Sequence, residues 1–325
     1  MKAKHLFYLV LLGTAVACSA PQEEAALPPA PSLLTRSVRF QSENLKDYTI
    51  FAFLEGDNGF AYLNTFPSSG RADGQTEVQL PVGNYQFIVA SGFGHSILPE
   101  PQHPVQAATL AGDMRFKAQT TAENAASLQP GEELFLPDAK ADSVYPLYTA
   151  SNIQINLKRA VSQALIYIKR GRKIGENIYE ALPYSQDSIV RYFSRVELQL
   201  ENAGTAVDAH STSSGEAPLV VTYPAAARDS ITPEGFAAFT GPFFFPPAGN
   251  VPLQFSVKLY PSANSPLPEL SLSTTGKAAR NERLIITVWI TQDWNFIGVT
   301  ADTSPIQKEN TGDSGIWDDI ITPQN

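Results

Sequence analysis

The stretch TEVQLPVGNYQFIVASG, residues 76–92, decides the fold class of this chain. Its apolar residues, rich in Val, Ile and aromatic types, alternate with other residues at a period of two, which is typical of β-strands. Gly83 permits a tight turn that divides the stretch into two strands. After that turn, Tyr85, Phe87 and Val89 are expected to lie on one face of a sheet.

The same period of two recurs along most of the chain. The residues Val196, Leu198 and Leu200 alternate with acidic and amide residues, so one face of that strand is expected to meet a core. Leu157 and Leu165 are likewise expected to pack inward. Other predicted strands are RSVRFQS (36–42), DYTIFAFLE (47–55), QINLKRAVSQALIYIKR (154–170), PLVVTYP (218–224), FAAFTGPFFFPP (236–247), VPLQFSVKLYP (251–261), LIITVWITQ (284–292) and WNFIGVT (294–300). These short strands predict an all-β chain built of antiparallel β-sandwiches.

Turn signals between these segments support the same fold class. Asp57, Asn58 and Gly59 predict a hairpin turn, because an Asn-Gly pair accepts positive φ at little cost. Helical patterns are scarce: residues 122–130 and 233–239 each predict no more than a turn or two of helix.

The N-terminus has the pattern of a bacterial lipoprotein signal over residues 1–17. Lys2 and Lys4 precede an apolar run from Leu6 to Ala17, which is shorter than the roughly 20 residues that a membrane-spanning helix needs. Cys18, the only cysteine of the chain, follows Ala-Val-Ala and completes a stretch that resembles a lipobox. We therefore expect Cys18 to carry a diacylglyceryl thioether and to become the mature N-terminus.

Residues 18–35 carry prolines and acids without apolar periodicity and predict a flexible tether. Two or more acyl chains hold a protein durably on a bilayer. Ser19 is not the aspartate that retains some lipoproteins at the inner membrane, and Gln22-Glu23-Glu24 resembles the acidic stretch that marks surface lipoproteins in Bacteroidetes. The expected location is therefore the outer membrane, facing outward.

Charge and length set further limits. The signal contains two of the 23 basic residues and none of the 32 acidic ones, so the mature chain carries 21 against 32, a net charge of -11. Nucleic acid is excluded as an expected partner, because phosphate binding needs clustered positive charge. The length predicts two sandwiches, over residues 36–149 and 150–325, each of which opens with a basic residue beside an apolar strand. The boundary has a margin of about 20 residues, because residues 154–170 could instead close the first sandwich.

The sequence holds no recognised catalytic or cofactor-binding motif, so no catalytic residue, metal or cofactor is predicted. His95 and His103 share one Gly- and Pro-rich loop, but no further ligand nearby completes a zinc site. A solvated surface loop is the favoured interpretation. The oxygen-bearing side chains of Asp57 and Asn58 are likewise too few for a calcium loop.

Two segments near the ends of the chain suggest assembly or processing. In the acidic tail, Ile316, Trp317 and Ile320 could lodge as a donated strand in a groove of a neighbouring subunit, or the tail could be a frayed terminus. An arginine-specific protease that cut after Arg36 would release the chain from its lipid. The alternative is that Arg36 and Arg39 serve as ordinary solubilising or edge-protecting residues.

Three stretches resemble the FimB-type fimbrillin-associated anchor lipoproteins of Bacteroidetes type V fimbriae. They are LPVGNYQFIVASG (80–92), INLKRAVSQALIYI (155–168), and FFFPPAGNVPLQFSVKLY (243–260) with NERLIITVWI (281–290). The resemblance implies two tandem transthyretin-like β-sandwiches, no catalysis, and subunits that join when a strand of one fills a groove in the next.

The leading hypothesis is therefore an outer-membrane anchor that holds a type V fimbrium and limits its length. A shaft or tip subunit released near Arg36 is an alternative within the same class. A surface glycan-binding lipoprotein is another alternative, in which Trp289, Trp294 or Trp317 stacks on sugars.

Overall fold

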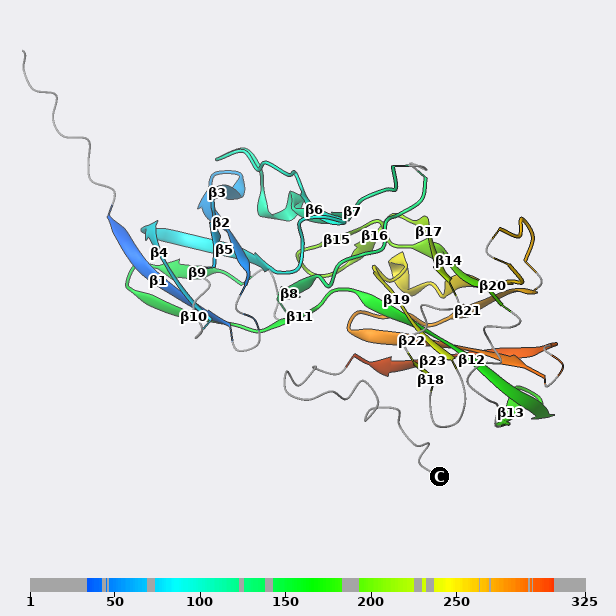
Figure 1. Ribbon diagram of the computed structural model, residues 1–325. Helices are drawn as coiled ribbons and strands as arrows, with labels where there is room; N and C mark the ends of the chain where they lie inside the picture. The colour runs from blue at the N-terminus through cyan, green and yellow to red at the C-terminus, as the bar shows by residue number, and fades with distance from the viewer. Residues whose placement is uncertain are drawn as a thin grey trace, which may run out of the picture. The chain divides into compact units, whose positions relative to one another are not determined.

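The computed structural model describes an all-β protein whose compact unit begins at Thr35 (Figure 1). Among the described residues, no helix is long and apolar enough to span a membrane, and the helical elements are short 3-10 turns such as Ala111–Asp113 and Ala248–Asn250. The structure describes residues 34–42, 45, 47–68, 74–122, 126–137, 143–182, 193–224, 230–231, 237–262, 264–268, 270–291, 293 and 295–306.

The first half of the chain forms a sandwich of two sheets. One sheet has the order β10-β1-β4 and the other has the order β3-β2-β5-β9. Their strands are β1 (Thr35–Ser42), β2 (Thr49–Gly56), β3 (Gly59–Pro67), β4 (Gln75–Pro81), β5 (Gly83–Ala90), β9 (Tyr145–Leu147) and β10 (Ser151–Ile155). The core between them includes Val38 and Phe40 of β1, Tyr85 and Phe87 of β5, and Ile153 of β10.

The second half forms another sandwich. One sheet has the order β17-β14-β20-β21, and the other has the order β18-β19-β12-β22-β23, with β13 paired to β12. The strands are β12 (Ser162–Gly175), β13 (Ile178–Ala181), β14 (Arg195–Ala203), β17 (Ala217–Pro224), β18 (Ser230–Ile231), β19 (Ala237–Phe244), β20 (Leu253–Tyr260), β21 (Leu270–Gly276), β22 (Glu282–Ile290) and β23 (Phe296–Pro305). Val196, Leu198 and Leu200 face this core and are fully buried, which confirms the prediction from their alternation.

Strands from both halves also pair with each other. The sheet β16-β15-β7-β6 combines two early strands with two later ones, and a two-stranded sheet pairs β8 with β11. Their bounds are β6 (Ile97–Glu100), β7 (Arg115–Ala118), β8 (Phe135–Pro137), β11 (Leu157–Arg159), β15 (Ala206–Asp208) and β16 (Ser213–Ser214). One hydrophobic cluster consequently runs from Phe51 of β2 to Ile290 of β22.

The hairpin and the turn predicted from glycines are both present. Gly56 pairs with Gly59 across the Asp57-Asn58 turn, and Gly59 has φ +107°. Val82 alone separates β4 from β5. Gly83 does not have a positive φ, and a Cβ there would lie 2.6 Å from Cδ1 of Leu54, the end of a flexible side chain that could shift, so the turn does not depend on glycine at this position.

Residues 237–239 belong to strand β19, which confirms the strand predicted over 236–247 at these residues and excludes there the alternative of a helical turn, because pairing with β12 overrides a weak helical pattern. One local prediction was wrong. Leu165 does not face the large core: Ala164 and Ile166 do, while Leu165 lies half-buried beside Tyr167 on the opposite face of β12. The reason is that the chain leaves the first sandwich after Leu157 and enters a new strand at Ser162, so the alternation does not continue in phase.

The hydrogen bonding also shows where the chain passes between the halves. β10 starts just after residue 150 but pairs with β1 of the first sandwich, whereas β12 belongs to the second. The two opening strands, β1 and β12, have the same scheme of neighbours: each pairs in parallel with a later strand, β10 or β22, and antiparallel with another, β4 or β19. A division into 36–149 and 150–325 stays a prediction.

Candidate functional site

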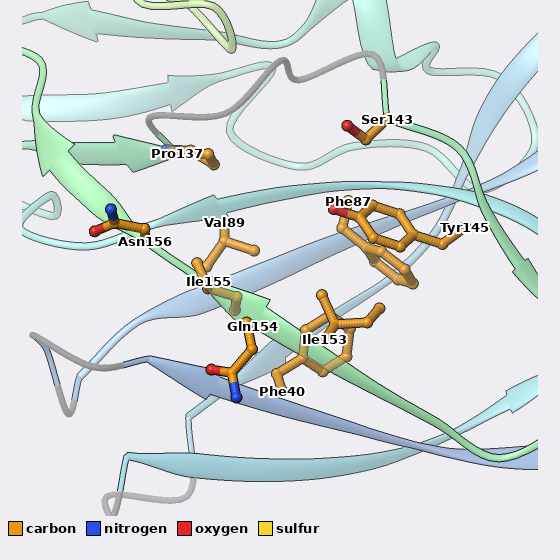
Figure 2. Close-up of a pocket in the computed structure, with 10 residues that line it drawn as sticks. All are labelled: Phe40, Phe87, Val89, Pro137, Ser143, Tyr145, Ile153, Gln154, Ile155 and Asn156. Carbon is orange, nitrogen blue, oxygen red and sulfur yellow. The ribbon is translucent and has the colours of Figure 1, made fainter.

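An apolar hollow opens in the first sandwich beside strands β9 and β10 (Figure 2). Among the described residues, β10 is one edge strand of its sheet and β9 is one edge strand of the other. The hollow has a cavity volume of about 40 Å³. Its lining consists of Phe40, Phe87, Val89, Pro137, Ser143, Tyr145, Ile153, Gln154, Ile155 and Asn156.

Packed aromatic rings form the floor of the hollow. Phe40 meets Phe87 edge to face, with 4.9 Å between ring centroids and 83° between planes. Phe87 also stacks on Tyr85, with ring centroids 5.6 Å apart and planes 2° apart. The ring of Tyr145 packs against Phe87 as well, with centroids 5.6 Å apart. Rings in these offset and edge arrangements hold one another in fixed positions. The floor is therefore preformed.

Alternation along two strands places the rest of the lining. In β10, Ile153 and Ile155 point into the sandwich and are 7% and 6% exposed, while Gln154 is exposed between them. In β5, Phe87 and Val89 point the same way, as the sequence predicts. An apolar hollow beside an unpaired strand edge can accept an extended segment, with main-chain hydrogen bonds to the edge and an apolar side chain in the hollow.

Tyr85, which stacks on Phe87, is fully buried. Its hydroxyl donates a hydrogen bond of 2.7 Å to the carbonyl oxygen of Pro81, at the turn between β4 and β5. Burial raises the pKa of Tyr85 to about 12. The hydroxyl therefore stays protonated and fixes the turn.

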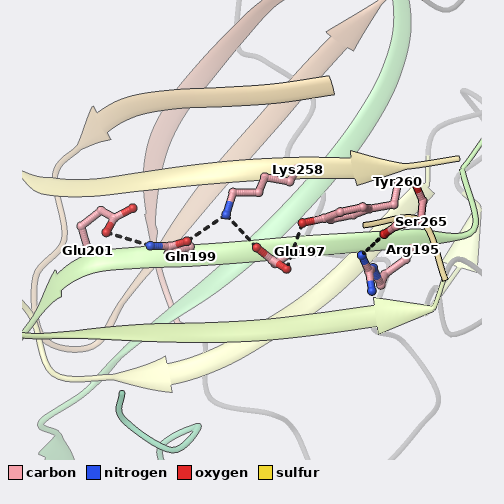
Figure 3. A network of polar contacts seen from close by, with 7 residues as sticks. All are labelled: Arg195, Glu197, Gln199, Glu201, Lys258, Tyr260 and Ser265. Atoms are coloured by element: carbon pink, nitrogen blue, oxygen red, sulfur yellow. Dashed lines mark hydrogen bonds and ion pairs between the residues drawn. The ribbon is translucent and has the colours of Figure 1, made fainter. Parts of the chain in front are cut away.

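A second polar cluster lies on the outer face of the sheet β17-β14-β20-β21 (Figure 3). Lys258 donates to Glu197 at 2.8 Å and to Gln199 at 3.0 Å, and the Tyr260 hydroxyl donates to Glu197 at 3.3 Å. The hydrogen bond to Glu197 raises the pKa of Lys258. The guanidinium of Arg195 lies 3.7 Å from the ring centroid of Tyr260.

This cluster ties strand β14 to strand β20. Glu197 and Gln199 of β14 both accept hydrogen bonds from Lys258 of β20. The charges of Glu197 and Lys258 satisfy each other.

Several residues singled out in the sequence lie elsewhere. Arg36 pairs with Leu80 in the ladder between β1 and β4, and its Nε donates to the carbonyl oxygen of Tyr148 at 2.9 Å. Trp289 is only 9% exposed and stacks on Tyr179 at 5.3 Å, so it is not an exposed platform for sugars. Outside the described residues lie Cys18, Trp294, Ile316, Trp317 and Ile320.

The loop that carries His95 is held in place by one carboxylate. The amides of His95, Ser96 and Ile97 all donate to Oε2 of Glu132 at 3.1 Å, so one carboxylate holds this loop against the segment just before β8. Within the described ranges, no group of three or more His, Cys, Asp or Glu side chains could hold a metal ion.

The sequence reasoning missed the hollow as a site. It predicted the shared face of Tyr85, Phe87 and Val89 but did not connect that face with Tyr145 and Ile153. The alternation of Ile153, Ile155 and Leu157 was the available signal. What brings the strands together is pairing between distant segments, which one sequence does not reveal.

Comparison with known proteins shows a shared fold. No protein-family model and no curated protein matches the sequence. A proposed polysaccharide-binding protein from Bacteroides thetaiotaomicron is similar in structure, with 14% identity and TM-score 0.51 over 85% of this chain and 99% of that one. A proposed adhesin from Bacteroides ovatus has 11% identity and TM-score 0.51 over 82% and 93% of the two chains. The fimbrial anchor protein Mfa2 from Porphyromonas gingivalis has a weaker likeness, with 11% identity and TM-score 0.46 over 84% and 99%.

Proposed function

We propose that this chain is a non-enzymatic surface protein, tethered to the outer membrane by lipid on Cys18, that anchors a type V fimbrium and limits its length. The observation that carries the proposal is the fold shared with the proposed adhesin of Bacteroides ovatus over 82% of this chain. The lipobox-like sequence before Cys18 and the resemblance to FimB-type anchor lipoproteins support the finer assignment.

The partner is a fimbrial shaft subunit, joined by addition of a strand. The apolar hollow next to the edge strands β9 and β10 supports this mode of joining, because an incoming strand could pair with an edge and place an apolar side chain in the hollow. In the opposite direction, Ile316, Trp317 and Ile320 of the tail could be donated to a partner.

Retention on the membrane is favoured over release near Arg36. Arg36 of β1 is already paired with Leu80 of β4, and its side chain donates a hydrogen bond to the backbone carbonyl of Tyr148. A protease needs an unpaired, extended substrate, so cleavage after Arg36 would require the start of β1 to open. This supports an anchor rather than a released shaft or tip subunit.

Glycan binding is a second candidate function. The fold is shared with a protein described as polysaccharide-binding, which favours this candidate. Because Trp289 is buried against Tyr179, sugar stacking would depend on Trp294 or Trp317. A glycan array tests it: loss of binding in Trp294→Ala or Trp317→Ala variants would support the function, and absence of binding by the unaltered protein would remove it.

A shedding assay tests anchoring. Replacing Cys18 with Ala in the cell should release fimbriae into the medium, because the thioether can no longer form. Ser19→Ala is the matched control and should leave fimbriae on the cells. Fimbriae that remain cell-bound in the Cys18→Ala strain would contradict the proposal.

A further inference from the structure

The first strand after the tether occupies the centre of its sheet. β1 pairs in parallel with β10 through five residue pairs, from Val38 with Ser151 to Ser42 with Ile155. On its other edge β1 pairs antiparallel with β4 through seven residue pairs. Both edges of β1 are thus held, so the strand cannot swing out of the sheet sideways.

The direction of β10 decides how a pulling force would act. A tether pulls on β1 at its N-terminal end, Thr35. The chain leaves β10 at its C-terminal end, Ile155, and continues through β11 into the second sandwich. Because β1 and β10 run in parallel, a force between the tether and the second sandwich pulls on opposite ends of the pair. Every hydrogen bond of the ladder is then strained at the same time, in shear.

Side chains reinforce this ladder on both faces. On the core side, Val38 and Phe40 of β1 are fully buried and share a cluster with Ile153 of β10. Toward the opposite end of the pair, the Gln154 amide donates to the side-chain carbonyl of Gln41 at 3.4 Å. Sliding β10 along β1 would have to move the buried side chains past one another as well as break the hydrogen bonds.

The bond from Arg36 adds a restraint at the tether end. Its Nε donates to the carbonyl oxygen of Tyr148, just before β10 begins. This contact joins the start of β1 to the residues just before β10, the strand on which the opposing force acts.

We propose that the parallel pair β1–β10 is a force-bearing clamp that transmits tension from the N-terminal tether to the second sandwich. Its purpose rests on the proposed anchor function with the shaft subunit joined through the tail residues Ile316, Trp317 and Ile320, since a fimbrium pulling on the second half of the chain would load it in this direction. The mechanical property itself depends only on the arrangement of the two strands.

Single-molecule pulling tests the clamp with two matched attachment points. The chain from Cys18 to Asn325 is made without lipid, so the single native thiol carries one handle. The second handle is attached through Asn156→Cys, directly after β10, or through Thr149→Cys, two residues before β10 begins. Both positions are exposed. The first geometry shears the pair, and the second opens it one residue pair after another from the end.

The shear geometry should rupture at a higher force than the opening geometry at the same loading rate, because shear must break the whole ladder at once while opening breaks one residue pair after another. Rupture of the first sandwich is recognised by a length gain of about 400 Å, from roughly 3.4 Å per residue over residues 35–155. Equal forces in the two geometries, or a lower force in shear, would overturn the clamp.

The two proposals can fail separately. If the rupture forces are equal and Cys18 is found lipidated in the cell, the clamp proposal is contradicted and the anchor proposal stands. A higher shear force with Cys18 unmodified in the cell would leave the clamp as a property of the fold and remove the anchor, because the handles do not depend on the lipid.

Discussion

At the scale of single residues, Gly92 stands where β5 ends and residues 133–135 cross it. Its φ is +75°, and a Cβ there would collide with the carbonyl oxygen of Glu133. The neighbouring residues Ser91 and Phe135 exchange backbone hydrogen bonds of 3.1 and 2.9 Å. Glycine at position 92 therefore lets residues 133–135 approach the end of β5 closely.

The Gly92→Ala variant should lose about 3 kcal/mol or more of unfolding free energy, because both backbone strain and a collision with main chain are introduced. Urea denaturation measures this loss. Gly112→Ala is the control, since a Cβ at Gly112 would meet no described atom within 4 Å, and its effect should stay within about 0.5 kcal/mol. Equal stabilities of the two variants would contradict the close approach.

The buried hydroxyl of Tyr85 predicts a pH dependence. Its pKa is raised from 10.0 to about 12, so between these pH values the unfolded chain ionises while the folded chain keeps its proton. The unfolded state then binds fewer protons, and stability falls as pH rises through this window. The full effect, reached above the raised pKa, is at most about 3 kcal/mol at 1.36 kcal/mol for each pKa unit.

The Tyr85→Phe variant should be less stable than the parent at neutral pH by about 1 kcal/mol, because the hydrogen bond to Pro81 is lost. Between pH 10 and 12 it should lose less stability than the parent, so the difference narrows or reverses. Unfolding free energies measured at pH 8, 10 and 11 test this. Tyr148→Phe, at a side chain 55% exposed, should follow the parent throughout, and parallel curves for Tyr85→Phe and the parent would contradict the prediction.

At the scale of elements, the strands were predictable where their alternation is strong and local. Residues 195–203 form β14 with the predicted residues buried. The predicted division between β4 and β5 lies next to Gly83. These features depend on side-chain period and turn chemistry, which the sequence contains directly.

Pairing between distant strands was not predictable in the same way. β10 joins β1 more than a hundred positions earlier, and β7 joins β15 of the second half. Such partners are selected by the packing of complete faces, which one sequence does not display. The inward orientation predicted for Leu165 was wrong for the same reason, because the face of β12 that meets the large core is decided by packing against distant strands. The hollow was missed because Tyr145 and Ile153 reach it through such pairings.

The loop at residues 93–97 should depend on one carboxylate. Replacing Glu132 with Ala removes the common acceptor of the His95, Ser96 and Ile97 amides, so their hydrogen exchange should become faster. Glu132→Gln keeps a carbonyl oxygen and should show a smaller change. The control is Glu100→Ala, which breaks only an exposed ion pair with Lys117 and should leave these amides unchanged. Unchanged exchange in Glu132→Ala would contradict the role of the carboxylate.

At the scale of the whole molecule, the two sandwiches share structure. The large hydrophobic cluster contains Phe51 and Phe116 from the first half together with Val207 and Ile290 from the second. Sheet β16-β15-β7-β6 is built from both halves. Unfolding one half would expose apolar surface and unpaired strand edges of the other.

The two halves should therefore unfold together. Calorimetry of the chain should give one transition whose calorimetric enthalpy equals its van't Hoff enthalpy. Two separate transitions would mean that the shared sheet and cluster do not couple the sandwiches, and that the division near residue 150 separates independent domains.

In both the clamp proposal and the anchor proposal, force enters the molecule through the tether. β1 begins immediately after the predicted tether and lies between β10 and β4. A chain held by lipid at Cys18 would transmit tension directly into this strand. A chain cut after Arg36 would lose the lipid and, with it, any pull on the clamp from the membrane.

The intact mass of the protein extracted from cell membranes distinguishes a lipid-tethered anchor from a released subunit. For the anchor we expect a chain that runs from Cys18 to Asn325 with the added mass of a diacylglyceryl group and its acyl chains. A chain that begins at Ser37 and carries no lipid would contradict lipid anchoring.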